Sequence, residues 1–550
     1  MKLLEILDDE MKANRSPLLA MAVCSGIADA AILAIINAAP QISASGKDHG
    51  NRLLLLFIIV VAAYILGLYS VLTKISHLFE RMVLNLRLRL LRKAVSAELS
   101  TLREIGSSQI YNRIAQEAPM LSQAAWQIAA CLEAVVMIAC CMLYLAWLSI
   151  PAFLVAISLI GAGALSYAMT NKRAEALIER TTDTEVSLLS SVTELLDGFK
   201  ELKLNGKKRA EFMEDTEGLC EEVRGLKVST ADIFNRNHIF AQSFSYLIIA
   251  VLVFVLPLFM PTYSDVLVAA TTTILFIIGS IGLVINTVPI LGKANIAAEH
   301  MLSLEAELDR HLGESHEEHA PAPPMPERFQ KITLKSLEYV HPGAEGFKLG
   351  PVDFTLEAGT VTFLVGGNGS GKSTLVEVLT GLQHPTGGWI RVDDRTVTDG
   401  NRGAYREYFG LIDSSFHLFK RLYGLDVIDE EGVKVLLRQL KLHDKTWLVG
   451  KEFTTLDLSS GQRRRLAMIV ALLENRPFYV FDEWTADQDV EFRRYFYQVL
   501  LPDLKAKGHT VLVVSHDDRF FGAADRVITL DKGSVISDVP RPSQTATGEA

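Results

Sequence analysis

The sequence predicts an α-helical membrane bundle of six spans that continues into a soluble α/β domain with a phosphate-binding loop. Of the 550 residues, 49% are hydrophobic and only 21% are charged, whereas a soluble globular chain carries roughly 25% charged residues. The first half of the chain contains long uncharged runs, and the second half alternates short apolar runs with helical patterns. This contrast predicts one membrane part and one soluble part.

Six apolar runs in the first half are long enough to cross a bilayer. A helix of about 20 residues spans a hydrocarbon core roughly 30 Å thick. The uncharged stretch from Ala134 to Asn171 is too long for one span, and Pro151 divides it into two. Asp265 marks the turn between the last two spans. We therefore expect spans at residues 17–40, 53–73, the two halves of 134–171, 239–264 and 266–292.

The placement of Lys and Arg orients these spans. Both residue types are concentrated in residues 74–113 and 172–238, which are the second and fourth connections. Cytoplasmic connections carry an excess of Lys and Arg, so we expect both connections and both termini in the cytoplasm. Their length and helical pattern predict helices that continue out of the membrane. The opening segment is expected to be an amphipathic surface helix whose lipid-facing residues are Leu3, Leu4, Ile6, Leu7 and Met11.

Changes in composition mark the domain boundaries. Residues 312–327 are rich in proline and acidic residues, which is typical of a linker, and residues 540–550 are expected to be a disordered tail. The transmembrane domain is therefore expected at 1–311 and the soluble domain at 328–539. The net charge of −10 argues against nucleic acid as a partner. The five cysteines show no metal-like spacing, so free thiols are expected.

A phosphate-binding loop follows the first buried strand of the soluble domain. Residues 361–365 form a short apolar run, and a helical pattern follows the loop, which is the strand–loop–helix context that this motif requires. Backbone amides of the loop wrap the phosphates, Lys372 reaches the outer phosphates, and the Ser373 hydroxyl binds Mg²⁺. The loop consists of Gly366, Gly367, Asn368, Gly369, Ser370, Gly371, Lys372, Ser373 and Thr374.

Two later strands end in polar residues that complete such a site. The run 478–481 ends in Asp482 and Glu483, and the run 511–514 ends at Ser515 and His516. We expect Asp482 to hold the metal and Glu483 to polarise the attacking water. His516 is expected to contact the terminal phosphate. A shorter motif precedes the acidic strand, and alone it predicts only a helix N-cap: Leu458, Ser459, Ser460, Gly461 and Gln462.

Together, these features resemble an ABC exporter half-transporter of the type IV fold over essentially the whole chain. The resemblance implies a homodimer that hydrolyses ATP to ADP and phosphate to drive transport. It also implies that each of two ATP sites uses the phosphate-binding loop of one chain and residues 458–462 of the other. Asp489 matches the aspartate that communicates between the two sites, and Tyr339 matches the aromatic residue that stacks on adenine.

The chain departs from the family where a glutamine usually senses the metal. Ser414 occupies that position in the stretch 411–419. A serine hydroxyl has a shorter reach than a glutamine amide but can still bind Mg²⁺ or water, and the adjacent Asp413 could assist it. We therefore expect Ser414 at the metal site, and the question whether Asp413 also contributes to metal binding stays open.

Several segments narrow the resemblance to one branch. The loop at 366–374, residues 416–419 and residues 482–489 look like the bacterial cyclic-peptide and siderophore exporters. That branch implies a peptide or siderophore-precursor cargo and a place in the bacterial inner membrane, in contact with lipid. The alternatives are a lipid or multidrug exporter, or a regulatory membrane ATPase that transports nothing.

Two acidic residues lie within the spans, where charge is costly. Asp29 lies in the first span and Glu133 near the start of the third. Such residues usually face the interior of the bundle. Each could contact a cationic or hydroxyl-bearing cargo, or could form a hydrogen bond between helices; for Glu133, a position at the membrane interface is a further alternative.

Overall fold

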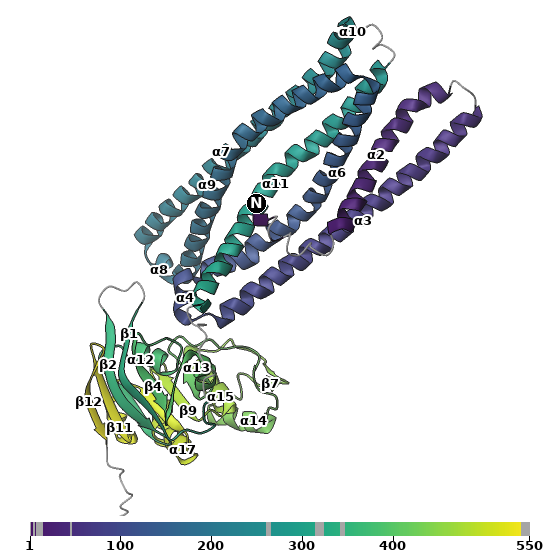
Figure 1. The fold of residues 1–550 in the computed structure, drawn as a ribbon. Coiled ribbons are helices and arrows are strands. Elements are labelled where there is room, and N and C mark those ends of the chain that lie inside the picture. Colours follow the sequence, from purple (N-terminus) through teal and green to yellow (C-terminus); the bar gives the residue numbers. More distant parts are fainter. Residues whose placement is uncertain are drawn as a thin grey trace, which may run out of the picture. The chain divides into compact units, whose positions relative to one another are not determined.

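The computed structural model describes residues 2–3, 6, 15–43, 47–259, 266–313, 324–341 and 347–540. The chain divides into two units (Figure 1). The first comprises Met1–Ala97 and Leu102–Arg310, and the second comprises Glu98–Thr101 and His311–Ala550. The first unit is the helical bundle, and the second contains the sheets.

The described residues contain six helices that are long and apolar enough to cross a membrane, which confirms the expected number of spans. They lie in α2 (Arg15–Ser43), α3 (Lys47–Ser96), α6 (Ala118–Leu148), α7 (Ile150–Asp197), α9 (Gly206–Ala250) and α11 (Leu267–Gly313). Short helical segments join or extend them: α4 (Leu99–Ile105), α5 (Ser107–Tyr111), η1 (Asn112–Glu117), α8 (Phe199–Leu204), η2 (Val251–Val255) and α10 (Leu256–Phe259).

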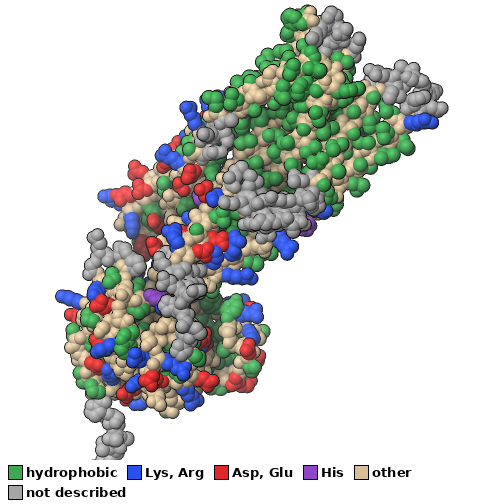
Figure 2. All heavy atoms as spheres, viewed as in Figure 1, with side chains coloured by type: hydrophobic (Ala, Val, Ile, Leu, Met, Phe, Trp, Pro, Cys, Tyr) green, Lys and Arg blue, Asp and Glu red, His purple; other side chains and the backbone are tan. Residues whose placement is uncertain are grey.

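The helices extend beyond a bilayer, as their patterns predict. The 50 residues of α3 correspond to about 75 Å at roughly 1.5 Å per residue, more than twice the hydrocarbon thickness. In Figure 2, hydrophobic side chains cover one half of the bundle and charged side chains gather around the other half. Outward-facing residues such as Leu66 and Leu143 are exposed in the apolar half. The surface is therefore divided between a lipid-facing and a water-facing zone.

Pro151 separates two helices, as expected. Ser149 is extended between α6 and α7, and its Oγ accepts a hydrogen bond of 3.4 Å from the Ala152 amide. Proline fits this first turn because its missing N–H would have no helical partner there. Helix α6 begins at Ala118, so Glu133 lies in the middle of this helix, and its place near the start of the third span stays a prediction.

The first residues do not all face lipid. Leu3 and Ile6 are buried in the core that α3, α6 and α11 form, and the Leu3 amide donates a 3.3 Å hydrogen bond to Asn295 Oδ1. The expectation was wrong for these two residues because their apolar side chains are covered by the bundle itself. The other three predicted lipid-facing residues, and the predicted turn at Asp265, lie outside the described residues.

The second unit is built on two main sheets. The strands are β1 (Lys331–Val340), β2 (Lys348–Glu357), β3 (Val361–Val365), β4 (Gly387–Val392), β5 (Arg395–Thr396), β6 (Phe409–Ile412), β7 (Leu448–Val449), β8 (Glu452–Phe453), β9 (Phe478–Asp482), β10 (Thr510–Val514), β11 (Arg526–Asp531) and β12 (Ser534–Pro540). The helices are α12 (Lys372–Leu379), α13 (Asp399–Arg406), α14 (Glu430–Gln439), α15 (Ser460–Glu474), α16 (Val490–Tyr495), η4 (Phe496–Leu500), α17 (Leu501–Ala506) and η5 (Asp518–Ala523).

The six-stranded sheet positions the expected site. Its order is β12-β11-β3-β10-β9-β6, and β3, β10 and β9 are parallel and fully buried. Such strands read as continuous apolar runs because helices cover both faces. Val514 lies opposite both Leu364 and Asp482, so the carboxyl ends of three strands meet at one edge. Ligands of open α/β sheets bind at that edge.

The domain ends differ slightly from the expected ones. Helix α11 reaches Gly313, two residues into the predicted linker, and Pro540 belongs to β12 and not to the tail. Residues 314–323 and 541–550 lie outside the described residues.

Candidate functional site

The phosphate-binding loop connects β3 to α12. Gly371 has φ +98°, and a Cβ there would lie 2.8 Å from Phe347 Cζ, so both backbone and space require glycine. Lys372 is 6% exposed, and its Nζ donates hydrogen bonds of 3.1 and 2.9 Å to the carbonyls of Gly366 and Gly367. These bonds hold the ammonium group across the loop, beside the amides that would bind phosphate.

Ser373 and Asp482 bring two oxygen donors together. Ser373 Oγ donates a 3.0 Å hydrogen bond to Asp482 Oδ2. Asp482 is 2% exposed, and its buried Oδ1 has no hydrogen-bond partner among the described residues. Burial raises the pKa of this carboxyl, and the nearby charges of Asp413 and Glu483 act in the same direction. A buried, unsatisfied acid oxygen beside a hydroxyl suits Mg²⁺, which prefers oxygen ligands.

Glu483 and His516 meet although they follow different strands. Glu483 Oε1 lies 3.2 Å from His516 Nε2, and both line a cavity of about 420 Å³. Glu483 has φ +50°, which is uncommon for a residue with a side chain. Its carbonyl accepts a 2.5 Å hydrogen bond from Arg464, and its amide donates one of 3.2 Å to Val514.

The expected sensor position holds Ser414 next to the carboxylate of Asp413. Ser414 is exposed, and its hydroxyl donates a 3.0 Å hydrogen bond to Asp413 Oδ1. Ser415 donates to the same carboxylate through its amide at 3.1 Å and its hydroxyl at 2.8 Å. The charge of Asp413, like that of Glu483, raises the pKa of Asp482. The metal role of Ser414 stays a prediction, and Asp413 is a second candidate for it.

The short motif before β9 caps a helix. Ser459 is the N-cap of α15, and it exchanges hydrogen bonds of 3.1 and 3.4 Å with Gln462. Gly461 is needed because a Cβ would lie 2.7 Å from the Asp487 carbonyl. Leu458 and Gly461 are half-buried, whereas Ser459 and Ser460 are exposed. Among the described residues, the Gly461 carbonyl of this motif accepts a hydrogen bond from Gln488, and the motif makes none to the phosphate-binding loop.

Asp489 is held in place on both sides. Its Oδ1 accepts a 2.8 Å bond from the Phe492 amide as the N-cap of α16, and its Oδ2 accepts a 2.8 Å bond from Arg465. The bond from the Phe492 amide, followed by Arg465, lowers the pKa of Asp489. The neighbouring Gln488 bonds the Gly461 carbonyl at 3.0 Å. The segment after Glu483 is therefore bonded to the start of α15.

The burial of Tyr339 argues against adenine stacking by this residue. Tyr339 is 4% exposed and packs in the sheet core, whereas stacking needs an accessible ring face. The half-exposed His341 ring lies edge-on to Tyr339 at 5.8 Å between centroids. No motif singled out His341, and its partly exposed ring next to a buried tyrosine makes it a second candidate for the base contact.

The structure also shows residues that no motif indicated. Arg464 is 9% exposed, and its Nε lies 3.0 Å from an Asp487 carboxylate oxygen. The indole of Trp484 donates a 3.0 Å bond to the Arg464 carbonyl and stacks on Phe496. These contacts support the strained backbone at Glu483. No sequence signal distinguishes Arg464 from the two arginines beside it.

The two acidic residues of the spans lie on packed helices. Asp29 of α2 and Glu133 of α6 are both half-buried. The two helices approach closely at Gly26, where a Cβ would lie 2.5 Å from Val136 Cγ1. This position fits a contact between helices, and the cargo role of the two acids stays a prediction.

Comparisons with known proteins agree with this architecture. The family models for the ABC transporter transmembrane region and the ABC transporter match residues 16–284 and 349–486. The chain is 32% identical over 483 residues to the ATP-binding protein SyrD of Pseudomonas syringae pv. syringae, covering 84% of this chain and 83% of that protein. A solved bacterial Atm1-family ABC exporter with ATP bound shares the fold, with a TM-score of 0.76, 17% identity and coverage of 96% of this chain and 95% of that one.

Two further relatives match over a shorter length. One is an ATP-dependent lipid A-core flippase of Bordetella avium, 31% identical over 231 residues, which are 40% of this chain and 39% of that protein. The other is the "Probable syringafactin export ATP-binding/permease protein SyfD" of Pseudomonas syringae pv. syringae, 32% identical over 203 residues, which are 34% and 31% of the two chains. The family matches, the long alignment and the fold lead to one conclusion. This chain belongs to the ABC transporter family and is an ABC exporter half-transporter, with a membrane domain and an ATPase domain on one polypeptide.

Proposed function

We propose that two copies of this chain pair in the bacterial inner membrane and use ATP and Mg²⁺ to export a peptide or siderophore precursor. The observation that carries active turnover is the pairing of Glu483 with His516 at 3.2 Å beside the Ser373–Asp482 pair at 3.0 Å. This complete set favours genuine ATP turnover over a degenerate regulator that only binds nucleotide. Both termini are assigned to the cytoplasm on the placement of Lys and Arg.

Each side chain of the site then has a defined role in ATP hydrolysis. The amides of residues 366–374 and Lys372 bind the phosphates of ATP. Ser373 and Asp482 would hold Mg²⁺, which supplies positive charge that offsets the negative charge of the phosphates. Glu483 orients the attacking water and accepts its proton, and His516 holds the Glu483 carboxylate and contacts the terminal phosphate.

Pairing of two chains follows from the exposed start of α15. Ser459 and Ser460 are exposed, and the first amides of a helix attract phosphate. In one chain this helix start makes no hydrogen bond to the phosphate-binding loop among the described residues. We therefore assign it to the ATP held by the partner chain, and Asp489 to the contact between the two sites.

Adenine recognition is the part of the site that we reassign. We propose that His341 contacts the base and that Tyr339 supports it from the sheet core. A His341→Ala variant should then bind ATP more weakly, with no change in the affinity for inorganic triphosphate. Tyr339→Phe should bind ATP as the wild type does, and a large loss of ATP affinity in this variant would restore the original assignment.

The cargo class rests on the name of a relative. SyfD is named for syringafactin export, whereas another relative is named as a lipid A-core flippase. The test compares a strain that lacks the chain with one that produces Glu483→Gln and one that produces the wild type. Loss of a secreted peptide from the medium, with its retention in cells, would support peptide export. Loss of a lipid from the outer leaflet would support the flippase, and unchanged secretion with intact ATPase would support the regulatory alternative.

A further inference from the structure

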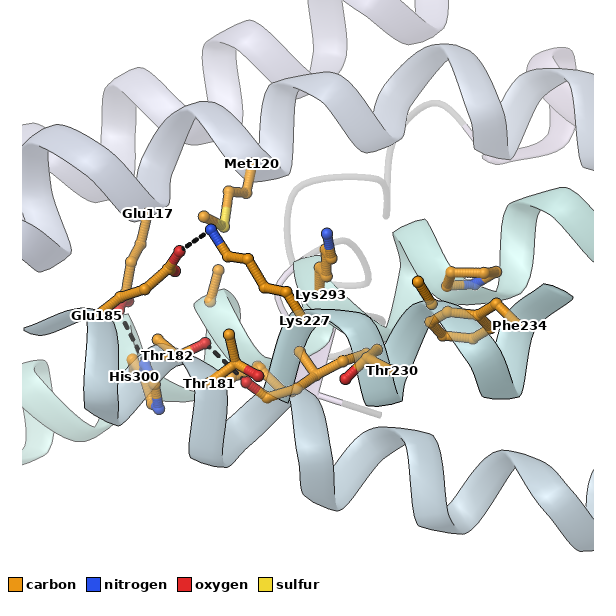
Figure 3. A pocket seen from close by; sticks show the side chains of 15 residues that line it. Glu117, Met120, Thr181, Thr182, Glu185, Lys227, Thr230, Phe234, Lys293 and His300 are labelled. Carbon is orange, nitrogen blue, oxygen red and sulfur yellow. Dashed lines mark hydrogen bonds and ion pairs between the residues drawn. The ribbon is translucent and has the colours of Figure 1, made fainter. Parts of the chain in front are cut away.

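A cavity of about 580 Å³ lies in the membrane unit, and acidic and basic side chains line part of it (Figure 3). Its walls come from the region where η1 meets α6 and from α7, α9 and α11. The volume lies within the range of about 300–1,000 Å³ that is typical of small-molecule sites. Apolar side chains form much of the wall, among them Met120, Ile178, Phe234 and Ile296. Nothing in the ATPase chemistry uses this cavity.

Most charges on its wall are paired with one another. Glu185 of α7 forms an ion pair with Lys227 of α9, as Figure 3 shows. The buried Glu117 binds His300 through Oε1 and Nδ1 at 2.8 Å. Lys293 of α11 is exposed, and among the described residues no carboxylate lies within 4.0 Å of its Nζ. Within the described part of the chain, Lys293 is therefore the lysine of this wall that has no carboxylate partner and can bind an anionic group.

The hydroxyl groups of the wall offer acceptors and not donors. Thr181, Thr182 and Thr230 each donate a hydrogen bond to a carbonyl of their own helix, at 2.6, 3.0 and 2.8 Å. Their remaining lone pairs can accept hydrogen bonds from a ligand. A peptide supplies N–H donors for these oxygens and a carboxylate for Lys293. A phosphate group alone would satisfy only the lysine.

A second, apolar cavity of about 250 Å³ is lined by the same helices, α6, α7, α9 and α11. Val288 lines the apolar cavity, and the next residue, Pro289, lines the charged one. Proline has no N–H, so it leaves the Ile285 carbonyl without its helical donor. The Tyr167 hydroxyl donates to this carbonyl at 3.4 Å and links α7 to α11 at the junction. A ligand that fills both cavities must have an apolar part and a charged part.

Given export of a peptide as proposed above, we infer that these two cavities are its binding site and that they select an acylated peptide with a free carboxylate. The carboxylate binds Lys293, peptide N–H groups donate to the threonine hydroxyls, and the acyl chain fills the apolar cavity. Charge-assisted hydrogen bonds are about twice as strong as neutral ones, so the carboxylate contributes most to specificity.

The test uses the full-length dimer in nanodiscs of uncharged dioleoylphosphatidylcholine. The probes are tritiated N-dodecanoyl-leucyl-leucine and its C-terminal amide. The acid should bind the wild type at least about tenfold more tightly than the amide. Lys293→Gln should remove this preference, and Lys293→Arg should retain it. Lys207→Gln is the matched control, because Lys207 lies on α9 outside the cavity and is highly exposed.

The apolar cavity has its own variant. A Cβ on Gly163 would lie 3.6 Å from Phe244 Cδ1 at the cavity wall, so Gly163→Leu would place its side chain in the cavity. This variant should weaken binding of both dodecanoyl probes and leave the ratio between acid and amide unchanged. An equal effect on N-acetyl probes would contradict the assignment of the acyl chain.

The outcomes separate this inference from the proposed function. If acid and amide bind the wild type equally, the role of Lys293 is wrong, while peptide export stands on the secretion test above. If neither probe binds, but dioleoylphosphatidate vesicles bind the wild type and not Lys293→Gln, the ligand is a lipid and both proposals are wrong. Elution volume and thermal unfolding of each variant show whether it is folded.

Discussion

Replacing Glu483 with glutamine tests the assignment of the hydrolytic group. The amide has nearly the same shape, so the 3.2 Å contact with His516 and the backbone bond to Val514 can remain. The substitution removes the negative charge and the ability to accept a proton from water. Positions of the phosphate-binding loop are untouched, so ATP should still bind.

The expected loss follows from the task of this carboxylate. A positioned general base contributes about 10²- to 10⁴-fold to a rate, which corresponds to about 2.7–5.5 kcal/mol in the activation barrier at roughly 1.36 kcal/mol per tenfold. We therefore expect Glu483→Gln to lower kcat at least ~10²-fold. Because hydrolysis would be blocked after assembly, the variant should also accumulate as a closed, ATP-bound dimer.

The assay is phosphate release by full-length protein in nanodiscs, with ATP affinity measured on the same preparation. Glu431→Gln is the control, since the Glu431 side chain is 82% exposed and pairs with Lys434 on the same helix, α14. This control should hydrolyse ATP at the wild-type rate. Near-normal turnover in Glu483→Gln would refute the reasoning, because hydrolysis would then not need a carboxylate at this position.

Three further predictions concern assembly, metal and local stability. Co-assembly of a Ser459→Arg chain with a Lys372→Ala chain should give dimers with one intact site, and the measured activity should exceed that of either homodimer; full activity of isolated monomers would disprove the composite site. Asp413→Asn should raise the Mg²⁺ concentration needed for half-maximal ATPase more than Ser414→Ala does, and wild-type behaviour of both variants would remove the metal role from this loop. Asp489→Ala should destabilise the first turn of α16 by about 1 kcal/mol through loss of its N-cap, seen as faster amide hydrogen exchange there at pH 7. Because the pKa of Asp489 is lowered in the fold, its stabilising effect is present above the ordinary pKa of an aspartate and is lost as the pH falls through the lowered one. The difference between variant and wild type should therefore disappear in acid.

The sequence by itself determined the features that depend only on residues close together along the chain. The length of uncharged runs predicts the number of spans, because a helix must be apolar over the whole hydrocarbon thickness. The order of residues 366–374 after a buried strand predicts a phosphate-binding loop, because glycines and Lys372 act within one turn. Pro151 marks a helix start for the same local reason.

Tertiary structure decided which side chains are buried and which meet. Tyr339 and Leu3 have suitable side chains for the roles first assigned to them, yet neighbouring elements cover both. Glu483 and His516 are 33 positions apart, and only the register of β9 against β10 brings them within 3.2 Å. Likewise, Lys293 looks like any other lysine in the sequence. Its lack of a carboxylate partner among the described residues follows from packing of separate helices, which no local pattern encodes.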